Sequence, residues 1–284
     1  MTDLPSPDSF VRQALIFRRE GENERAIRLL EQALAAAPEH LDAQIQLGAI
    51  YLDLGKTSQA RQLLRSAARC APSSPIVRRL LAIGHLQTGD LYSAKQEAEE
   101  AVRLAPEDGV NHTILGRVLA RRQSWAAAEA ALRRGVELAP HSSYTLIHLG
   151  HFLVGRRRLA EAALVGEDAG REAPSDFDVL LLRGYIALQL GKAEQARDFA
   201  LWALSQRPSN REAVRLLVSV KTRQSPWLGL WWRMNSSFWL RVLVVIASIP
   251  LNLWFLTPIY LVAGHFIFQR MIANELKTVK LKSF

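Results

Sequence analysis

The stretch AQIQLGAIYLDLGKTSQARQLLRSAARCAP, residues 43–72, contains the pattern on which the fold depends. Apolar residues recur at helical spacing on both sides of Gly55, and glycine reaches the left-handed backbone angles of a helix end at low cost. Pro72 closes the stretch, and proline ends a helix because it lacks an amide hydrogen and restricts the residue before it. The stretch therefore predicts two helices joined by a tight turn.

The same pattern recurs with a period of 34 residues. Its prolines are Pro38, Pro72, Pro106, Pro140, Pro174 and Pro208. Small residues precede each proline by 24, 12 and 5 positions, and such residues let paired helices approach closely. The first of these registers is Ala14, Gly48, Ala82, Gly116, Gly150 and Gly184. Repetition of this kind indicates stacked helix pairs that share one continuous core.

These features resemble the tetratricopeptide repeat family. The resemblance implies an all-α fold, an α-solenoid of six helix–turn–helix repeats with a capping helix at 211–223, within residues 1–224. The repeats are 7–40, 41–74, 75–108, 109–142, 143–176 and 177–210. The large residues of the family are kept less well than the small ones. Its tryptophan near the repeat start, for example, is replaced by Gln44, Arg78 and His112 in the second to fourth repeats.

Two repeats also depart from the pattern at the turn, where Gln123 and Arg157 replace glycine. A side chain at a left-handed position costs about 1 kcal/mol relative to glycine. We expect either a distorted turn at these two positions or a locally less stable part of the array.

The resemblance further implies a concave face lined by the first helices, on which members of the family bind peptides or partner helices. In this sequence the corresponding positions mix aliphatic residues with arginines, which suits an amphipathic or acidic protein segment. The expected partner-binding residues are Arg79, Ile83, Arg117, Arg121, Ile147, His151, Tyr185 and Gln189. The alternative is that these charges only solvate an exposed helix face.

No motif for catalysis or for a cofactor is present in the sequence. His148 and His151 lie three apart on one helical face, but no carboxylate or cysteine accompanies them in register for a metal. Cys70, the single cysteine, falls in the last turn of a second helix, where we expect it to pack as a small residue. We therefore predict a non-enzymatic protein without metal or cofactor.

The net charge of +9 is concentrated near the end of the chain. Residues 211–284 contain ten basic and two acidic residues, whereas residues 1–210 contain 26 basic and 25 acidic residues. Because the repeats are nearly neutral, the charge argues against a nucleic-acid partner.

The basic charge instead flanks residues 242–268, a run of 27 residues without a formal charge. This run predicts insertion of residues 239–274 into a lipid bilayer, after an interfacial linker at 225–238 and before a basic tail at 275–284. The residues expected to shape the membrane segment are Trp239, Pro250, Trp254, Thr257, Pro258 and Tyr260.

A hairpin of two membrane helices and a single span both remain open. Thr257 and Pro258 form a typical helix start, and basic flanks at both ends fit a hairpin with both ends in the cytoplasm. A single tilted helix fits as well, since 27 residues extend roughly 40 Å. The first ten residues do not have the basic start and apolar core of a signal peptide. We therefore expect an integral membrane protein, in a bacterial inner membrane, with cytoplasmic repeats.

Together these features predict a membrane-anchored scaffold that binds a partner segment in its groove. The alternative is an assembly or quality-control factor for membrane or secreted clients. In that case Asn252 and the prolines of the apolar run would mark a second contact surface within the membrane.

Overall fold

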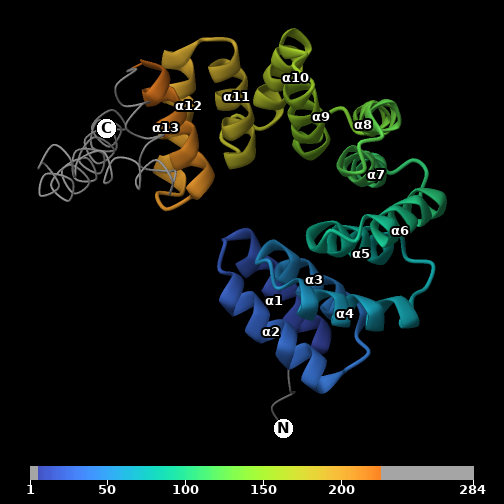
Figure 1. Ribbon diagram of the computed structural model, residues 1–284. Coiled ribbons are helices and arrows are strands. Elements are labelled where there is room, and N and C mark those ends of the chain that lie inside the picture. The colour runs from blue at the N-terminus through green and yellow to red at the C-terminus, as the bar shows by residue number, and fades with distance from the viewer. Residues whose placement is uncertain (1–5, 225–284) are drawn as a thin grey trace, which may run out of the picture. The chain divides into compact units, whose positions relative to one another are not determined.

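The computed structural model describes residues 6–224, which form thirteen α-helices (Figure 1). The first helices of the repeats are α1 (Pro7–Arg19), α3 (Leu41–Asp53), α5 (Pro75–Thr88), α7 (Gly109–Arg121), α9 (Ser143–Gly155) and α11 (Phe177–Gln189). The second helices are α2 (Asn23–Ala36), α4 (Thr57–Cys70), α6 (Leu91–Leu104), α8 (Trp125–Leu138), α10 (Leu159–Glu172) and α12 (Ala193–Gln206), and α13 (Arg211–Gln224) follows them. The expected all-α repeat fold is confirmed over these residues.

Residues 225–284 lie outside the described residues, and with them the expected linker, membrane segment and basic tail. Within residues 6–224, no helix has both the length and the apolar character needed to cross a bilayer. The chain divides within α9, between Phe152 and Leu153, into two compact units, and each unit is described by itself.

In the first unit, α1, α3, α5 and α7 each pack against the second helix of their own repeat, and the last three also pack against the preceding second helix. Neighbouring first helices also contact one another, from α1 to α7, whereas second helices of this unit do not form comparable pairs. The first helices therefore share one face, called here the first-helix face, and the second helices stand apart on the other side.

In the second unit, α11 packs against α10 and α12, and α13 packs against α11 and α12. The side chains of Ala213, Leu216 and Leu217 on α13 are buried in this contact. The last helix therefore covers the apolar side of the preceding pair, as expected of a capping helix.

The small-residue registers are buried and set how closely paired helices approach. A Cβ atom added to Gly48 would lie 2.9 Å from Leu64 Cγ, and one added to Gly116 would lie 2.6 Å from Leu132 Cγ. Glycine on the first helix therefore makes room for leucine on the second. In the third repeat these two positions hold Ala82 and Ala98, which are both fully buried.

The turns at Gln123 and Arg157 are not distorted, so that part of the sequence expectation is wrong. Both residues adopt the left-handed conformation of the turn glycines, with φ of 62° and 58°. Hydrogen bonds hold it, since the amide of Gln123 donates to Ala120 O at 3.0 Å and that of Ser124 to Leu119 O at 2.9 Å. The side chains are accommodated at the conformational cost of a left-handed non-glycine residue.

Gln123→Gly should therefore stabilise the first unit by about 1 kcal/mol, because glycine adopts this conformation without the Cβ penalty. Urea unfolding followed by circular dichroism would measure the gain. Gln123→Ala is the matched control, since alanine keeps the Cβ atom and should give no such gain. Equal stability of the glycine and alanine variants would contradict the explanation.

Side chains that cap the N-termini of first helices and of α13 form a further repeated register, which was not recognised in the sequence. The capping side chains recur at multiples of 34 residues, and each accepts a hydrogen bond from a backbone amide of the first turn. They are Ser6, His40, Ser74, Asp108, Asp176 and Asn210.

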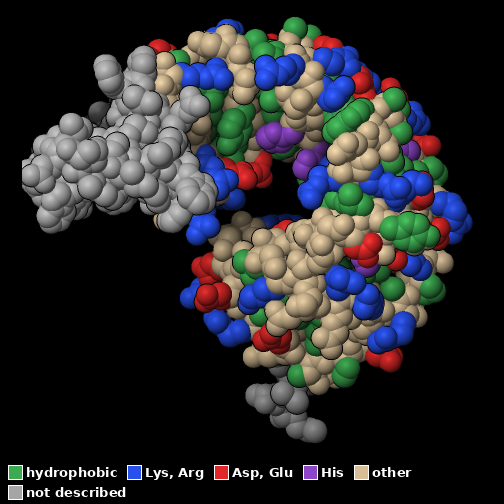
Figure 2. Space-filling view, viewed as in Figure 1, with side chains coloured by type: hydrophobic (Ala, Val, Ile, Leu, Met, Phe, Trp, Pro, Cys, Tyr) green, Lys and Arg blue, Asp and Glu red, His purple; other side chains and the backbone are tan. Residues whose placement is uncertain are grey.

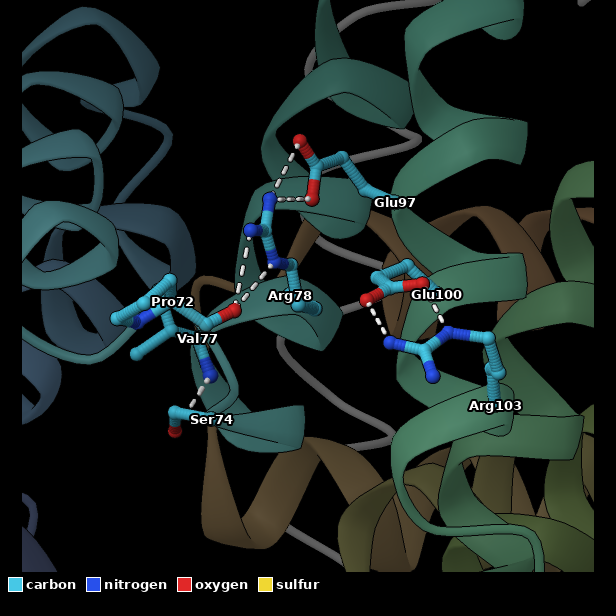
Figure 3. Close-up of polar contacts among 7 residues, drawn as sticks. All are labelled: Pro72, Ser74, Val77, Arg78, Glu97, Glu100 and Arg103. Atoms are coloured by element: carbon cyan, nitrogen blue, oxygen red, sulfur yellow. Dashed lines mark hydrogen bonds and ion pairs between the residues drawn. The ribbon is translucent and has the colours of Figure 1, made fainter.

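Polar residues at the family's tryptophan position also have a structural role. The Nε2 of Gln44 donates to Pro38 O at 2.7 Å. The Nη2 of Arg78 donates to Pro72 O at 3.0 Å (Figure 3). His112 makes the equivalent 2.8 Å bond to the carbonyl of the preceding register proline. These side chains satisfy a carbonyl that the helix-ending proline leaves without an intrahelical partner.

Candidate partner-binding surface

Two arginines of the first-helix face pair with acidic residues at an end of the next first helix, since Asp53 is the last residue of α3 and Asp108 directly precedes α7. Arg18 Nη2 lies 3.0 Å from Asp53 Oδ2. Arg79 Nη1 lies 2.7 Å from Asp108 Oδ2 and donates to Asn111 Oδ1 at 3.1 Å. The Arg79 side chain is only 18% exposed. Part of the guanidinium that the sequence assigns to a partner therefore already binds within the protein.

Arg117 on α7 is different, because its partner is neutral. Its Nη1 donates to the Tyr144 hydroxyl at 2.7 Å, and no carboxylate pairs with it among residues 6–224. The half-buried guanidinium therefore keeps its positive charge and two further nitrogen donors. A partly desolvated, unpaired arginine is a strong site for an anion.

Tyr144 and His148, one turn apart on α9, support Arg117 from the side. Their rings meet edge to face with centroids 4.4 Å apart. Burial, with the charges of Arg117 and His151, lowers the pKa of His148 from 6.5 to about 3, so this imidazole is neutral at physiological pH. Burial also raises the pKa of Tyr144, an effect that Arg117 and Arg79 partly oppose. Tyr144 thus lies within the fields of arginines from two neighbouring first helices.

The remaining predicted residues of the first unit differ in how much surface they offer. Arg121 and His151 are exposed, whereas Ile83 is half-buried and packs against the core. Ile147 is only 8% exposed and contributes mainly to the core. The usable surface of this unit is therefore more basic and less aliphatic than the sequence predicted.

Tyr185 and Gln189 belong to the second unit. Gln189 is exposed, and the half-buried Tyr185 hydroxyl donates to Glu212 O at 3.5 Å. Burial and then the Glu212 charge raise the pKa of Tyr185.

Sequence reasoning missed Tyr144, Asp108 and Asn111. Tyr144 sits at the second position of its repeat, and its spacing of four from His148 on a helix was an available signal. Asn111 is fully buried, and its Nδ2 donates to Ala101 O at 3.1 Å. It therefore fixes Arg79 from within the core, which no pattern of the sequence indicates.

The histidine, cysteine and acidic side chains bear on the metal site and the cysteine packing considered from the sequence. Within residues 6–224, no three of the His, Cys, Asp and Glu side chains are placed to hold a metal ion. Cys70 ends α4 and is exposed, so the expectation that it packs in the interior is wrong. Over the visible surface, basic and acidic side chains are interspersed (Figure 2).

Comparison with known families decides the classification. Models described as tetratricopeptide repeat match residues 17–83, 79–143 and 147–217. The chain belongs to the tetratricopeptide repeat family. Tetratricopeptide repeats generally serve as scaffolds for protein–protein interaction, and this chain has the fold suited to that role. No curated protein matches the sequence.

Solved structures share the repeat fold. A tetratricopeptide repeat protein from Parabacteroides merdae has a TM-score of 0.65 at 15% identity, over 78% of this chain and 86% of that one. Cut9–Hcn1 of the APC/C has a TM-score of 0.64 at 16% identity, over 76% of this chain but 43% of that one. PilW, a type IV pilus biogenesis factor, has a TM-score of 0.57 at 20% identity, over 74% and 98%. At these identities the likeness extends to the fold alone.

Proposed function

We propose that this chain is a non-enzymatic, membrane-anchored scaffold whose first-helix face binds an amphipathic or acidic segment of a partner protein. The observation that carries this proposal is Arg117, a half-buried guanidinium with a neutral partner and no carboxylate within residues 6–224. A partner carboxylate would gain a charge-assisted hydrogen bond there without breaking an existing ion pair.

The surroundings of Arg117 favour an acidic segment over a basic one. Arg79 and Tyr144 are close enough for the charge of Arg79 to act on the phenol. The acidic groups of this region, Asp53 and Asp108, are already paired with arginines. A basic segment would find no free carboxylate among these residues, whereas an acidic one would meet unpaired positive charge.

Membrane anchoring rests on the sequence of residues 242–268. This uncharged run of 27 residues with basic flanks supports attachment of the repeats to the cytoplasmic face of a bacterial inner membrane. Confinement to a membrane raises the effective concentration of the first-helix face for other membrane-bound proteins.

An assembly or quality-control factor for membrane or secreted clients is the second candidate. Asn252 and the two prolines within the apolar run favour it, because polar and helix-breaking residues inside a membrane segment commonly mark a functional surface. PilW, one of the similar folds, is itself a pilus biogenesis factor.

Photocrosslinking in membranes tests both candidates on the full-length chain. A crosslinker at Arg121 should capture a partner, and Arg117→Glu should reduce that yield by at least about tenfold, since it replaces attraction of a carboxylate by repulsion. Arg28→Glu makes the same charge change at an exposed position of α2 and is the control. Exchange of residues 225–284 for an unrelated membrane anchor should leave capture by the scaffold intact, whereas it should abolish capture by the second candidate. Undiminished capture in Arg117→Glu would refute binding of the partner at the first-helix face. Recovery of the wild-type chain in the soluble fraction without detergent would refute membrane anchoring.

A further inference from the structure

A second groove lies on the other side of the first unit, between second helices α2 and α4 with α3 as its floor. Its volume is about 450 Å³. Gln44 and Tyr51 lie on the floor, Leu34 lines one wall, and Gln59, Gln62 and Arg69 line the other. The groove is therefore rich in uncharged amides, which can both donate and accept hydrogen bonds.

In the third repeat, the corresponding positions form ion pairs (Figure 3). Arg78 Nη1 lies 3.1 Å from Glu97 Oε2 while its other nitrogens donate to Pro72 O. Arg103 donates two hydrogen bonds to the carboxylate of Glu100, at 2.7 and 2.6 Å. Every charge of this network is therefore matched by a neighbour.

In the second repeat, 34 residues earlier, both carboxylates are missing. Leu63 and Ser66 occupy the positions of Glu97 and Glu100, while Arg69 retains the position of Arg103. Arg69 is exposed and has no ion pair within residues 6–224. The helix that carries it, α4, contains three arginines and no acidic residue.

An unmet hydrogen-bond acceptor lies on the floor of this groove. Gln44 replaces Arg78 and is 3% exposed; its Nε2 bonds to Pro38 O at 2.7 Å. Its Oε1 is a buried side-chain oxygen without a hydrogen-bond partner in the described part of the chain. A buried acceptor in this state costs about 1–3 kcal/mol unless a donor reaches it.

We propose that the groove between α2 and α4 binds an extended acidic peptide segment, with a carboxylate on Arg69 and a main-chain N–H directed to Gln44 Oε1. The carboxylate takes the place that Glu100 has beside Arg103 in the third repeat. The N–H gives Gln44 Oε1 the donor that it lacks among the described residues. Since α4 rises about 21 Å and an extended chain advances about 3.3 Å per residue, the groove accepts about six residues. A nucleic acid fits less well, because its phosphodiester backbone has no N–H donor for Gln44. This site is independent of the first-helix face proposed above.

Fluorescence anisotropy with the purified full-length chain tests the site. The first probe is a pool of labelled random peptides of about six residues that contain Glu and Asp. The second is the same pool with Gln and Asn in place of Glu and Asp, and the third is a single-stranded oligodeoxynucleotide. The acidic pool should bind at least about tenfold more tightly than its amide counterpart. Arg69→Glu should remove that preference.

Ser66→Glu is the sharper variant, because it rebuilds the Glu100–Arg103 pair of the third repeat within α4. It should preserve the fold, and in the Arg117→Glu background, where the first-helix face no longer attracts a carboxylate, it should weaken the acidic pool by about tenfold. Arg117→Glu, on the first-helix face, should leave at least half of the binding at the groove. The proposal is overturned if Ser66→Glu leaves binding unchanged in the Arg117→Glu background, if the acidic pool shows no preference over the amide pool, or if the oligonucleotide binds more tightly than the peptides. Loss of all acidic-peptide binding in Arg117→Glu alone would assign the binding to the first-helix face instead and would equally overturn it.

Discussion

Gly116→Ala and Leu132→Ala should each destabilise the protein, and together they should cost less than the sum of the two. A Cβ atom on Gly116 would lie 2.6 Å from Leu132 Cγ and 3.0 Å from Leu132 N, so alanine there should cost about 1–3 kcal/mol by overpacking. Leu132 is 1% exposed, and its truncation should cost about 2–5 kcal/mol through the cavity it leaves. The double variant places the new methyl group in that cavity.

The third repeat supports this reciprocity, because it holds Ala82 and Ala98 at the same two positions. Double-mutant analysis of urea unfolding would measure the coupling, which we expect to exceed about 1 kcal/mol for residues in contact. Gly155→Ala is the matched control, since a Cβ atom there meets no other atom within 4 Å. If the losses of stability in the Gly116→Ala and Leu132→Ala variants add within about 0.5 kcal/mol, the added methyl group and the leucine side chain do not compete for the same space.

The repeat fold could be predicted because its determinants are local and periodic. A proline, a turn and three small residues recur every 34 positions, and each acts within one helix pair. The turn at Gln123 shows that the register outweighs a single residue's preference, because its backbone hydrogen bonds hold φ at 62° despite the missing glycine. The position of this turn could therefore be predicted from the other repeats, although the sequence of the fourth repeat alone does not indicate it.

The candidate site could be predicted only in outline, because its chemistry depends on contacts between repeats. The sequence placed Arg79 and Arg117 on one face, and the structure agrees that both lie on first helices. It did not indicate that Arg79 is matched by Asp108, 29 residues away, while Arg117 hydrogen-bonds a tyrosine and pairs with no carboxylate of residues 6–224. Which arginine lacks a carboxylate partner therefore depends on residues 27 to 29 positions away, for which a single sequence contains no periodic signal.

The same limit applies to the polar residues that stand in place of the family's tryptophan. Gln44 and Arg78 differ in charge and size, yet both reach the carbonyl of the preceding register proline. Their common role is visible only when the carbonyl and the side chain are seen together. They differ in that Gln44 keeps an amide oxygen without a hydrogen-bond partner in the described part of the chain, whereas the guanidinium of Arg78 is paired with Glu97.

His148 should make the stability of the first unit depend on pH. Burial lowers the pKa of its imidazole from 6.5 to about 3 in the folded protein. Between these values the unfolded chain binds a proton that the folded chain does not bind, so stability falls as pH falls. The limiting slope is about 1.4 kcal/mol per pH unit, and the loss attributable to this residue between pH 7 and pH 5 is about 2 kcal/mol.

Replacing His148 with phenylalanine should remove that contribution while retaining an aromatic ring beside Tyr144. Urea unfolding of the wild type and of His148→Phe at pH 7 and pH 5 measures the difference directly. His141→Phe, at an exposed position of the same unit, controls for the loss of one histidine and should keep most of the wild-type pH dependence. Titration of the His148 ring by NMR gives a second measurement, in which the imidazole should remain neutral at pH 5. A half-protonated ring near pH 6.5, or an unchanged pH dependence in His148→Phe, would mean that solvent reaches this side chain. The neutral support proposed for Arg117 would then be lost, because a charged imidazole beside the guanidinium would repel it and weaken its hold on Tyr144.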